Sequence, residues 1–164
     1  MSHEYILWIA LAAYGIHALE EYELNWRDWA RSVLRLPVEW GSFYVVNALV
    51  VVLGVCCAMV GWQKPSFALG FAALMIINAT FFHVLPTIVT RVYSPGLATA
   101  LALFYPVAGW AYYGAQLDGV LSPGTGVVSA IFGALLMAAP IVLLKVKDRK
   151  MFAYGSDPRR ESTR

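Results

Sequence analysis

The sequence predicts an all-α protein, a polytopic membrane helical bundle of about five transmembrane helices with one amphipathic interfacial helix. Of the 164 residues, 60% are hydrophobic and only 13% are charged, and the mean hydropathy is +0.63. The apolar residues come in long blocks rather than in the stripes of a soluble amphipathic helix. A soluble domain needs a larger share of polar and charged residues than this to cover its surface. We therefore expect one membrane domain, residues 1–148, whose partner is the lipid bilayer and not nucleic acid.

Hydropathy divides this domain into five spans. They cover residues 5–22, 40–62, 67–90, 97–117 and 126–144. The second span is uncharged throughout and is bracketed by tryptophan, a residue that favours the boundary between lipid and water. Residues 149–164 form a polar C-terminal tail, which we expect to be disordered.

Residues 25–36 have the pattern of a helix that lies in the membrane interface. Their apolar members fall at i, i+3, i+4, i+7 and i+8, and are Trp26, Trp29, Ala30, Val33 and Leu34. Charged and polar side chains occupy the other face, and Pro37 follows the segment. This pattern predicts an amphipathic helix that ends at the proline.

The basic residues predict the orientation in the membrane. With five spans, eleven of the twelve Lys and Arg residues fall on one side and only Lys64 falls on the other. The positive-inside rule then places the N-terminus outside and the C-terminus in the cytoplasm, in the inner (cytoplasmic) membrane of a bacterium.

The first span carries ionisable residues near its cytoplasmic end. Residues 5–19 contain no Asp, Glu, Lys or Arg and measure roughly 22 Å as a helix, whereas the hydrocarbon core of a bilayer is about 30 Å thick. To cross, the helix must carry His17, Glu20 and Glu21 into the membrane or to its edge. Positions i, i+3 and i+4 share one helical face, so these side chains can converge. Ionisable groups at such depths by default indicate a functional site.

A second histidine is expected at nearly the same depth. His17 and the two glutamates lie about 18–24 Å along the first span, and His83 lies about 24 Å along the third span, which runs in the same direction. Because unpaired ionisable groups are costly in lipid, we expect these two spans to touch. Glu20 or Glu21 should then lie within direct or single-atom-bridged reach of His83.

These residues define a candidate site. His17, Glu20, Glu21 and His83 offer the donor atoms that bind a divalent metal, Zn²⁺ or Fe/Mn, and Glu20, Glu21 and His83 are the candidate catalytic residues. Two plainer interpretations stay open. The glutamates end the helix in water beside basic residues of the next segment, or His83 is a hydrogen-bonded packing residue.

Further polar residues border this layer. The candidates for cofactor binding are Tyr93, Asn47 and Asn78. Hydrogen bonding between helices is the default interpretation of the two asparagines. Pro86 leaves a carbonyl near Phe82 without its helical donor and is expected to kink the third span.

Small residues form two patterns. Pro95 and Gly96 occupy the centre of a tight turn between the third and fourth spans, and Ser94 can cap the helix that follows. In the fifth span a small residue recurs at every fourth position, at Gly126, Ala130, Ala134 and Ala138. That stripe either packs inside the monomer or forms the face of a homodimer.

Three motifs in order, H-x-x-E-E at 17–21, His83, and Y-x-P-G at 93–96, resemble the HXXEE family of bacterial integral membrane proteins. The resemblance covers roughly residues 5–117. It implies that His17, Glu20, Glu21, His83 and the turn at 93–96 belong to one site, and it implies no reaction.

The leading functional hypothesis is a membrane-embedded enzyme that acts on a hydrophobic or lipid-like substrate by metal-assisted or acid–base chemistry. The alternative is a small proton-coupled transporter or channel that uses the same His/Glu cluster. A third hypothesis has His17 and His83 as axial ligands of a b-type haem.

Overall fold

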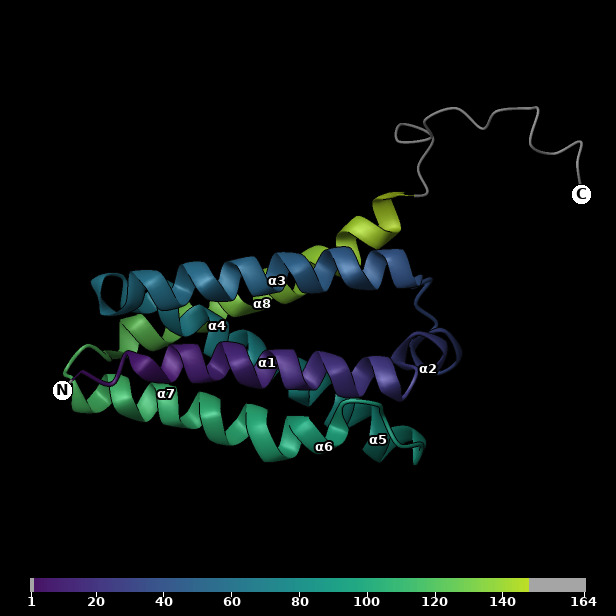
Figure 1. Cartoon of the computed structure of the whole chain (residues 1–164), viewed down its shortest axis with the longest axis horizontal. Helices are drawn as coiled ribbons and strands as arrows, with labels where there is room; N and C mark the ends of the chain where they lie inside the picture. The colour runs from purple at the N-terminus through teal and green to yellow at the C-terminus, as the bar shows by residue number, and fades with distance from the viewer. Residues whose placement is uncertain (1, 148–164) are drawn as a thin grey trace, which may run out of the picture.

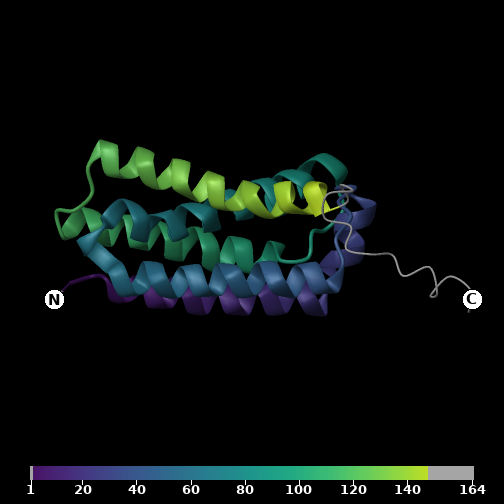
Figure 2. The same cartoon turned by 90° about the horizontal axis from the view of Figure 1, so that it is seen from above.

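The computed structural model describes residues 2–147, and every element in that range is helical. The all-α prediction is therefore confirmed for this part of the chain. The helices run side by side along one long axis (Figure 1, Figure 2), and α4 lies at the centre, in contact with α1, α3, α7 and α8. The tail predicted at 149–164 lies outside the described residues.

Five long helical rods coincide with the five predicted spans. The first rod is α1 (Tyr5–Glu23), and the second is α3 (Trp40–Val60) with the 3₁₀ turn η1 (Gly61–Gln63); the short helix α2 (Trp26–Ser32) lies between them. The third rod consists of α4 (Pro65–Asn78), the π-helical turn η2 (Ala79–Val84) and α5 (Leu85–Thr90). The fourth consists of α6 (Leu97–Thr99), the π-helical turn η3 (Ala100–Phe104) and α7 (Tyr105–Leu117), and the fifth is α8 (Pro123–Lys147).

Two of these rods, Trp40–Gln63 and Pro65–Thr90, are long and apolar enough to cross a membrane. The first rod, α1, falls outside this class, and its last turn carries Glu20, Glu21 and Glu23. Within α8, the stretch Pro123–Ala139 is apolar but shorter than a candidate span. Length and hydropathy thus identify two candidate spans among the described helices.

The core is built on small residues that let α4 and α8 approach closely. All residues from Ala68 to Met75 in α4 are buried. A Cβ atom added at Gly133 of α8 would lie 2.7 Å from the backbone nitrogen of Leu74, so only glycine fits there. The stripe predicted for the fifth span is elsewhere on α8, because Ala130, Ala134 and Ala138 are exposed. The stripe therefore does not pack inside the monomer, and its role in a homodimer stays a prediction.

Helix α2 is shorter than the sequence pattern predicted, because it ends at Ser32 rather than at residue 36. Arg35 has φ +55°, which a continuing helix cannot contain, and the residue before Pro37 is disfavoured in the helical conformation. The apolar face is confirmed, but Trp29 and Ala30 pack against Val38 and Phe43 of the same chain.

The N-terminal end of the bundle is fastened through Asp118. Its carboxylate accepts hydrogen bonds from the backbone amide of His3 (2.6 Å) and from the indole N–H of Trp62 (2.7 Å), and it pairs with the His3 ring (2.6 Å). The amide and the ring of His3, together with Trp62, hold the pKa of Asp118 well below its ordinary range. This carboxylate therefore joins α7, η1 and the segment before α1.

Proline shapes the two π-helical turns. Pro86 and Pro106 are each the second residue after such a turn ends, and neither can donate the backbone hydrogen bond of a regular helix. The freed carbonyl of Phe82 accepts the hydroxyl of Ser94 at 3.1 Å instead. The prediction that Pro86 frees this carbonyl is confirmed. The wide turn η2 contains His83, and π-helical turns are frequent at functional sites.

Candidate metal centre

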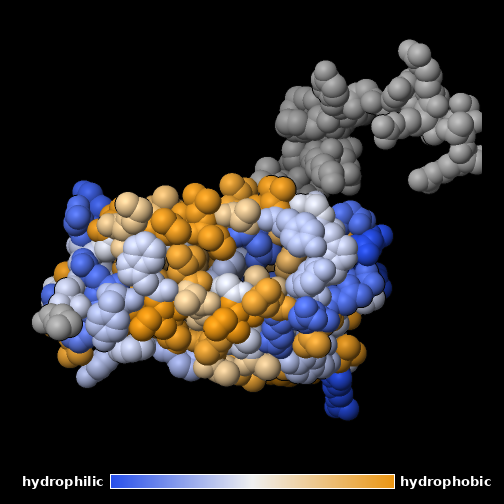
Figure 3. Space-filling view, viewed as in Figure 1, coloured by the Kyte–Doolittle hydropathy of each residue, from blue (hydrophilic) through white to orange (hydrophobic). Residues whose placement is uncertain are grey.

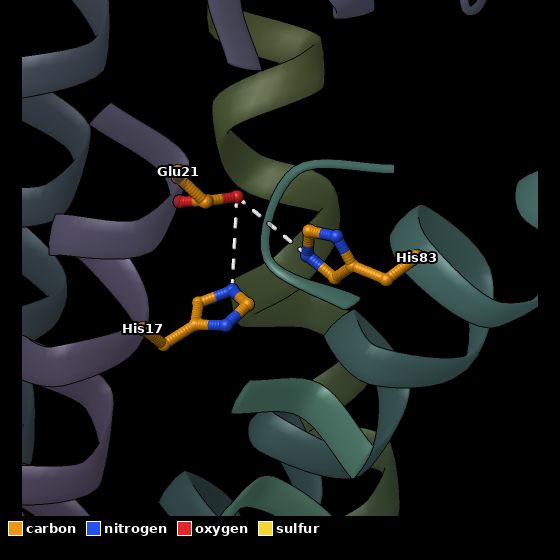
Figure 4. A group of neighbouring side chains, drawn as sticks. All are labelled: His17, Glu21 and His83. Atoms are coloured by element: carbon orange, nitrogen blue, oxygen red, sulfur yellow. Dashed lines mark ion pairs between the residues drawn. The ribbon is translucent and has the colours of Figure 1, made fainter. Parts of the chain in front are cut away.

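Three ligand-type side chains meet in the interior of the bundle. His17 and Glu21 come from α1 and His83 comes from η2, with exposed fractions of 1%, 6% and 0%. The Glu21 Oε1 atom lies 3.7 Å from His17 Nε2 and 3.6 Å from His83 Nε2, and all three ligand atoms fall within 4.8 Å of one another (Figure 4). The predicted meeting of the first and third spans through Glu21 and His83 is confirmed.

The spacing of these atoms suits a small divalent cation. Metal–ligand bonds of about 2.0–2.2 Å in a tetrahedral site place neighbouring ligand atoms about 3.3–3.6 Å apart. The two separations from Glu21 Oε1 to the imidazole nitrogens are close to that range. Catalytic zinc sites and non-haem iron sites use two imidazoles and one carboxylate as ligands. Such sites leave at least one coordination position of the metal open to water or substrate.

The tautomer of His17 follows from its neighbours. Its Nδ1 atom lies 2.7 Å from the Thr99 hydroxyl, and that hydroxyl donates its hydrogen to Glu20 Oε2 at 2.6 Å. The hydroxyl then accepts from Nδ1–H, which leaves a lone pair on His17 Nε2. That atom is buried, and nothing in the described chain forms a hydrogen bond with it. A buried acceptor without a donor fits a cation.

The same reasoning applies to His83. Its Nδ1 atom lies 3.0 Å from the Ser94 hydroxyl, which donates to the Phe82 carbonyl, so Nδ1–H donates to Ser94. The remaining Nε2 lone pair faces the side-chain oxygen of Asn78 at 3.0 Å. The amide of Asn78 turned by 180° donates from Nδ2 to this lone pair, and a bound metal would take the place of that hydrogen bond. Asn78 thus borders the centre as a fourth polar side chain, whereas the sequence had suggested packing as the default.

Glu20 does not join this group, which corrects its prediction as a metal ligand, whereas a catalytic role of Glu20 stays a prediction. Its carboxylate accepts from the Thr99 backbone amide (2.8 Å), the Ala98 amide (3.3 Å) and the Tyr93 hydroxyl (2.8 Å). Free amides at the start of a helix attract a carboxylate, and α6 begins here. Glu20 therefore orients Thr99, and through it His17, while Tyr93 contacts Glu20 rather than the centre.

The turn at 93–96 closes the site. Gly96 has φ +94°, and a Cβ atom there would lie 2.7 Å from His83 Cε1 and 2.8 Å from His17 Cε1. Only glycine fits against both imidazoles. Asn47, by contrast, accepts from the Tyr14 hydroxyl (2.7 Å) and donates to the Phe43 carbonyl (2.9 Å), as expected of a residue that joins two helices.

Sequence reasoning missed Thr99, whose hydroxyl sets the tautomer of His17. One signal was available, because Thr99 follows the Tyr93–Gly96 motif by one helical turn. Its role was not predictable, since it depends on how α6 packs against α1.

A cavity of about 80 Å³ reaches the centre from one side. It lies between α1, α2, α3, α4 and α8, and among its lining residues Glu21 and Asn78 also belong to the centre. Neither imidazole lines it. From this cavity, the centre is reached past the carboxylate of Glu21 and the amide of Asn78.

Comparisons with known proteins identify a family and a relative of similar sequence. The profile of a family described as "Protein of unknown function with HXXEE motif" matches residues 8–111. The uncharacterized protein YrkK of Bacillus subtilis (strain 168) is 28% identical over 146 residues, which cover 84% of this chain and 92% of that protein. No solved structure matches the chain.

Proposed function

This chain belongs to the family of proteins of unknown function with the HXXEE motif, and we propose that it is a membrane-embedded enzyme with a divalent metal at His17, Glu21 and His83. The metal candidates are Zn²⁺ and Fe/Mn. The substrate is hydrophobic or lipid-like. The proposal rests chiefly on one observation, the convergence of two buried imidazoles and one buried carboxylate.

The surface supports a membrane location with five spans. Figure 3 shows apolar residues across the middle of one face and hydrophilic residues at both ends. Large apolar side chains of α3 are exposed, among them Val45, Leu49, Val52 and Met59. Contiguous exposed apolar surface of this kind is typical of contact with lipid. Together with the basic residues, it favours five spans in a bacterial inner membrane, with the N-terminus outside and the C-terminus in the cytoplasm.

The chemistry of the centre follows from its residues. Thr99 and Ser94 each accept a ring hydrogen, which directs the Nε2 lone pairs of His17 and His83 inward. When bound, a divalent metal supplies Lewis-acid activation of water or of a substrate carbonyl. The carboxylate of Glu21 lies at the cavity wall, where it can accept a proton from water or substrate.

A proton-coupled transporter is the second candidate, and one observation favours it. Hydrogen bonds of 2.7, 2.6 and 2.8 Å link His17 through Thr99 and Glu20 to Tyr93, whose side chain is exposed. Such a chain can carry protons between a buried group and water. A Glu20-dependent proton flux in proteoliposomes, with Glu23→Gln as the control, would favour transport over catalysis.

The haem hypothesis does not fit the site. Glu21 Oε1 lies within 3.7 Å of both Nε2 atoms, and the two rings are 4.7 Å apart between centroids. A porphyrin plane between the imidazoles would have to occupy the position of the Glu21 carboxylate.

Metal content tests the proposed function. We expect about one equivalent of Zn, Fe or Mn by mass spectrometry in the detergent-purified protein, and loss of it in His17→Ala and Glu21→Ala. Glu23→Ala is the matched control, because Glu23 lies on the same helix but is exposed. Less than about 0.2 equivalents in the wild type, or equal content in all variants, would contradict the proposal.

A further inference from the structure

The cavity beside Glu21 has a distinct chemical character. Its wall is mostly apolar and includes Val46, Val50, Leu74 and Leu136. Its polar members are few and gather toward the metal centre and the first turns of α3. A site with an apolar wall and a few convergent polar groups is typical of a small-molecule pocket.

We propose that this cavity binds an uncharged, single-chain acyl ester or amide, with its acyl carbonyl accepting a hydrogen bond from the indole N–H of Trp26. The inference rests on the proposed function in one respect, because that function makes Glu21 part of a reaction centre. It goes further in naming the charge, the number of chains and the functional group of the ligand.

The charge of the ligand follows from the lining residues. The wall, as far as residues 2–147 form it, contains one carboxylate, Glu21, and no Lys or Arg. The nearby guanidinium groups of Arg27 and Arg31 pair with Glu39. An anionic head group would face Glu21 without a cationic side chain, at a large desolvation cost. A cationic head group would compete with the metal for the same carboxylate. An uncharged head group meets neither obstacle.

The carbonyl follows from the donors. Trp26 lines the cavity, and its indole N–H is buried without an acceptor among the described residues. The amide groups of Asn47 and Asn78 add hydrogen-bonding capacity at the same wall. A buried donor without a partner is costly, and an ester or amide oxygen would satisfy it.

The number of chains follows from the volume. One water-sized group needs about 10–15 Å³ of such space, so about 80 Å³ accommodates roughly five to eight groups, which is part of one chain and not two chains. Figure 3 shows a hollow between α1 and α3 with apolar residues around it. The rest of a longer chain would leave through this side opening, toward the lipid.

Photolabelling tests the proposal with a matched pair of variants. The probe is a monoacylglycerol with a diazirine in its chain, added to the full-length protein in phosphatidylcholine vesicles. We expect labelling of cavity residues that excess unlabelled monoacylglycerol suppresses. Val46→Trp fills the cavity and should lower the labelling roughly tenfold. Val45→Trp is the control, because the side chain of Val45 is 60% exposed and does not line the cavity, and it should leave the labelling unchanged. Equal effects of the two variants, or labelling without competition, would overturn the proposal.

A second variant and two other probes test the head group. Trp26→Phe keeps most of the ring and removes the N–H, so we expect labelling to fall roughly threefold to tenfold. Unchanged labelling in Trp26→Phe would refute the carbonyl assignment. Stronger labelling by a fatty acid or an alkylammonium analogue would refute the uncharged head group.

Metal content separates this inference from the proposed function. His17→Ala should lose the metal and keep the labelling, since His17 does not line the cavity. Val46→Trp should keep the metal and lose the labelling. A metal-free wild type with competable labelling would contradict the enzyme and leave the ligand site standing. A metal-loaded wild type without labelling would contradict the ligand site and leave the enzyme standing.

Discussion

Replacing Thr99 with valine is expected to weaken the metal centre without touching a ligand. The Thr99 hydroxyl accepts from His17 Nδ1–H at 2.7 Å and donates to Glu20 Oε2 at 2.6 Å. Valine has the same shape but leaves that buried N–H without an acceptor, which costs about 1–3 kcal/mol of stability. Loss of such an outer partner typically lowers metal affinity about 10–100-fold.

The rest of the network should survive this change. Glu20 keeps the backbone amides of Thr99 and Ala98 and the hydroxyl of Tyr93, so the start of α6 stays capped. The assay is competition of the purified protein with a chromophoric chelator for Zn²⁺. Thr99→Ser should restore the affinity, and Thr90→Val, at an exposed threonine that donates to Pro86, should leave it unchanged. Wild-type affinity in a folded Thr99→Val, or no rescue by serine, would refute the positioning role.

Three further outcomes are expected. Gly96→Ala strains a backbone at φ +94° and drives a methyl group into both imidazoles, so thermal unfolding should show a loss of about 1–3 kcal/mol, with Gly15→Ala, at an open position, as the control. The folded structure lowers the pKa of Asp118, so the ionised carboxylate stabilises the fold above its ordinary pKa of 3.8, and this stabilisation is lost as the pH falls below 3.8. Asp118→Asn should flatten the plot of unfolding free energy against pH in that acidic range. Pro86→Ala returns a donor to the Phe82 carbonyl, so thermal unfolding followed by circular dichroism should show a more stable helix. The same change should displace His83 and lower the metal affinity. Equal metal affinity would contradict a role for the π-helical turn.

Hydropathy and spacing were sufficient to predict the positions of the long helices and the meeting of α1 with the helix that carries His83. Hydropathy locates helices because their apolar blocks are long, and proline chemistry located the freed Phe82 carbonyl. Helix boundaries near prolines were less predictable, as the early end of α2 at Ser32 shows.

The choice between Glu20 and Glu21 could not be made from the sequence. Positions i+3 and i+4 from His17 share one helical face, and both residues are carboxylates. The choice depends on tertiary packing, because the free amides of Ala98 and Thr99 bind Glu20 and leave Glu21 to face the imidazoles. The roles of Thr99 and Asn78 depend on the same packing.

X-ray absorption at the edge of the bound metal reports on the ligands of the centre itself. With His17, Glu21 and His83 as ligands, the spectrum should show nitrogen and oxygen neighbours at about 2.0–2.2 Å, with multiple scattering from two imidazoles and no sulfur. Glu21→Ala should change the oxygen shell or abolish binding, and Glu23→Ala should leave the spectrum unchanged. A shell with sulfur, a shell of oxygen alone, or one that Glu21→Ala leaves intact would contradict a metal centre at these three residues.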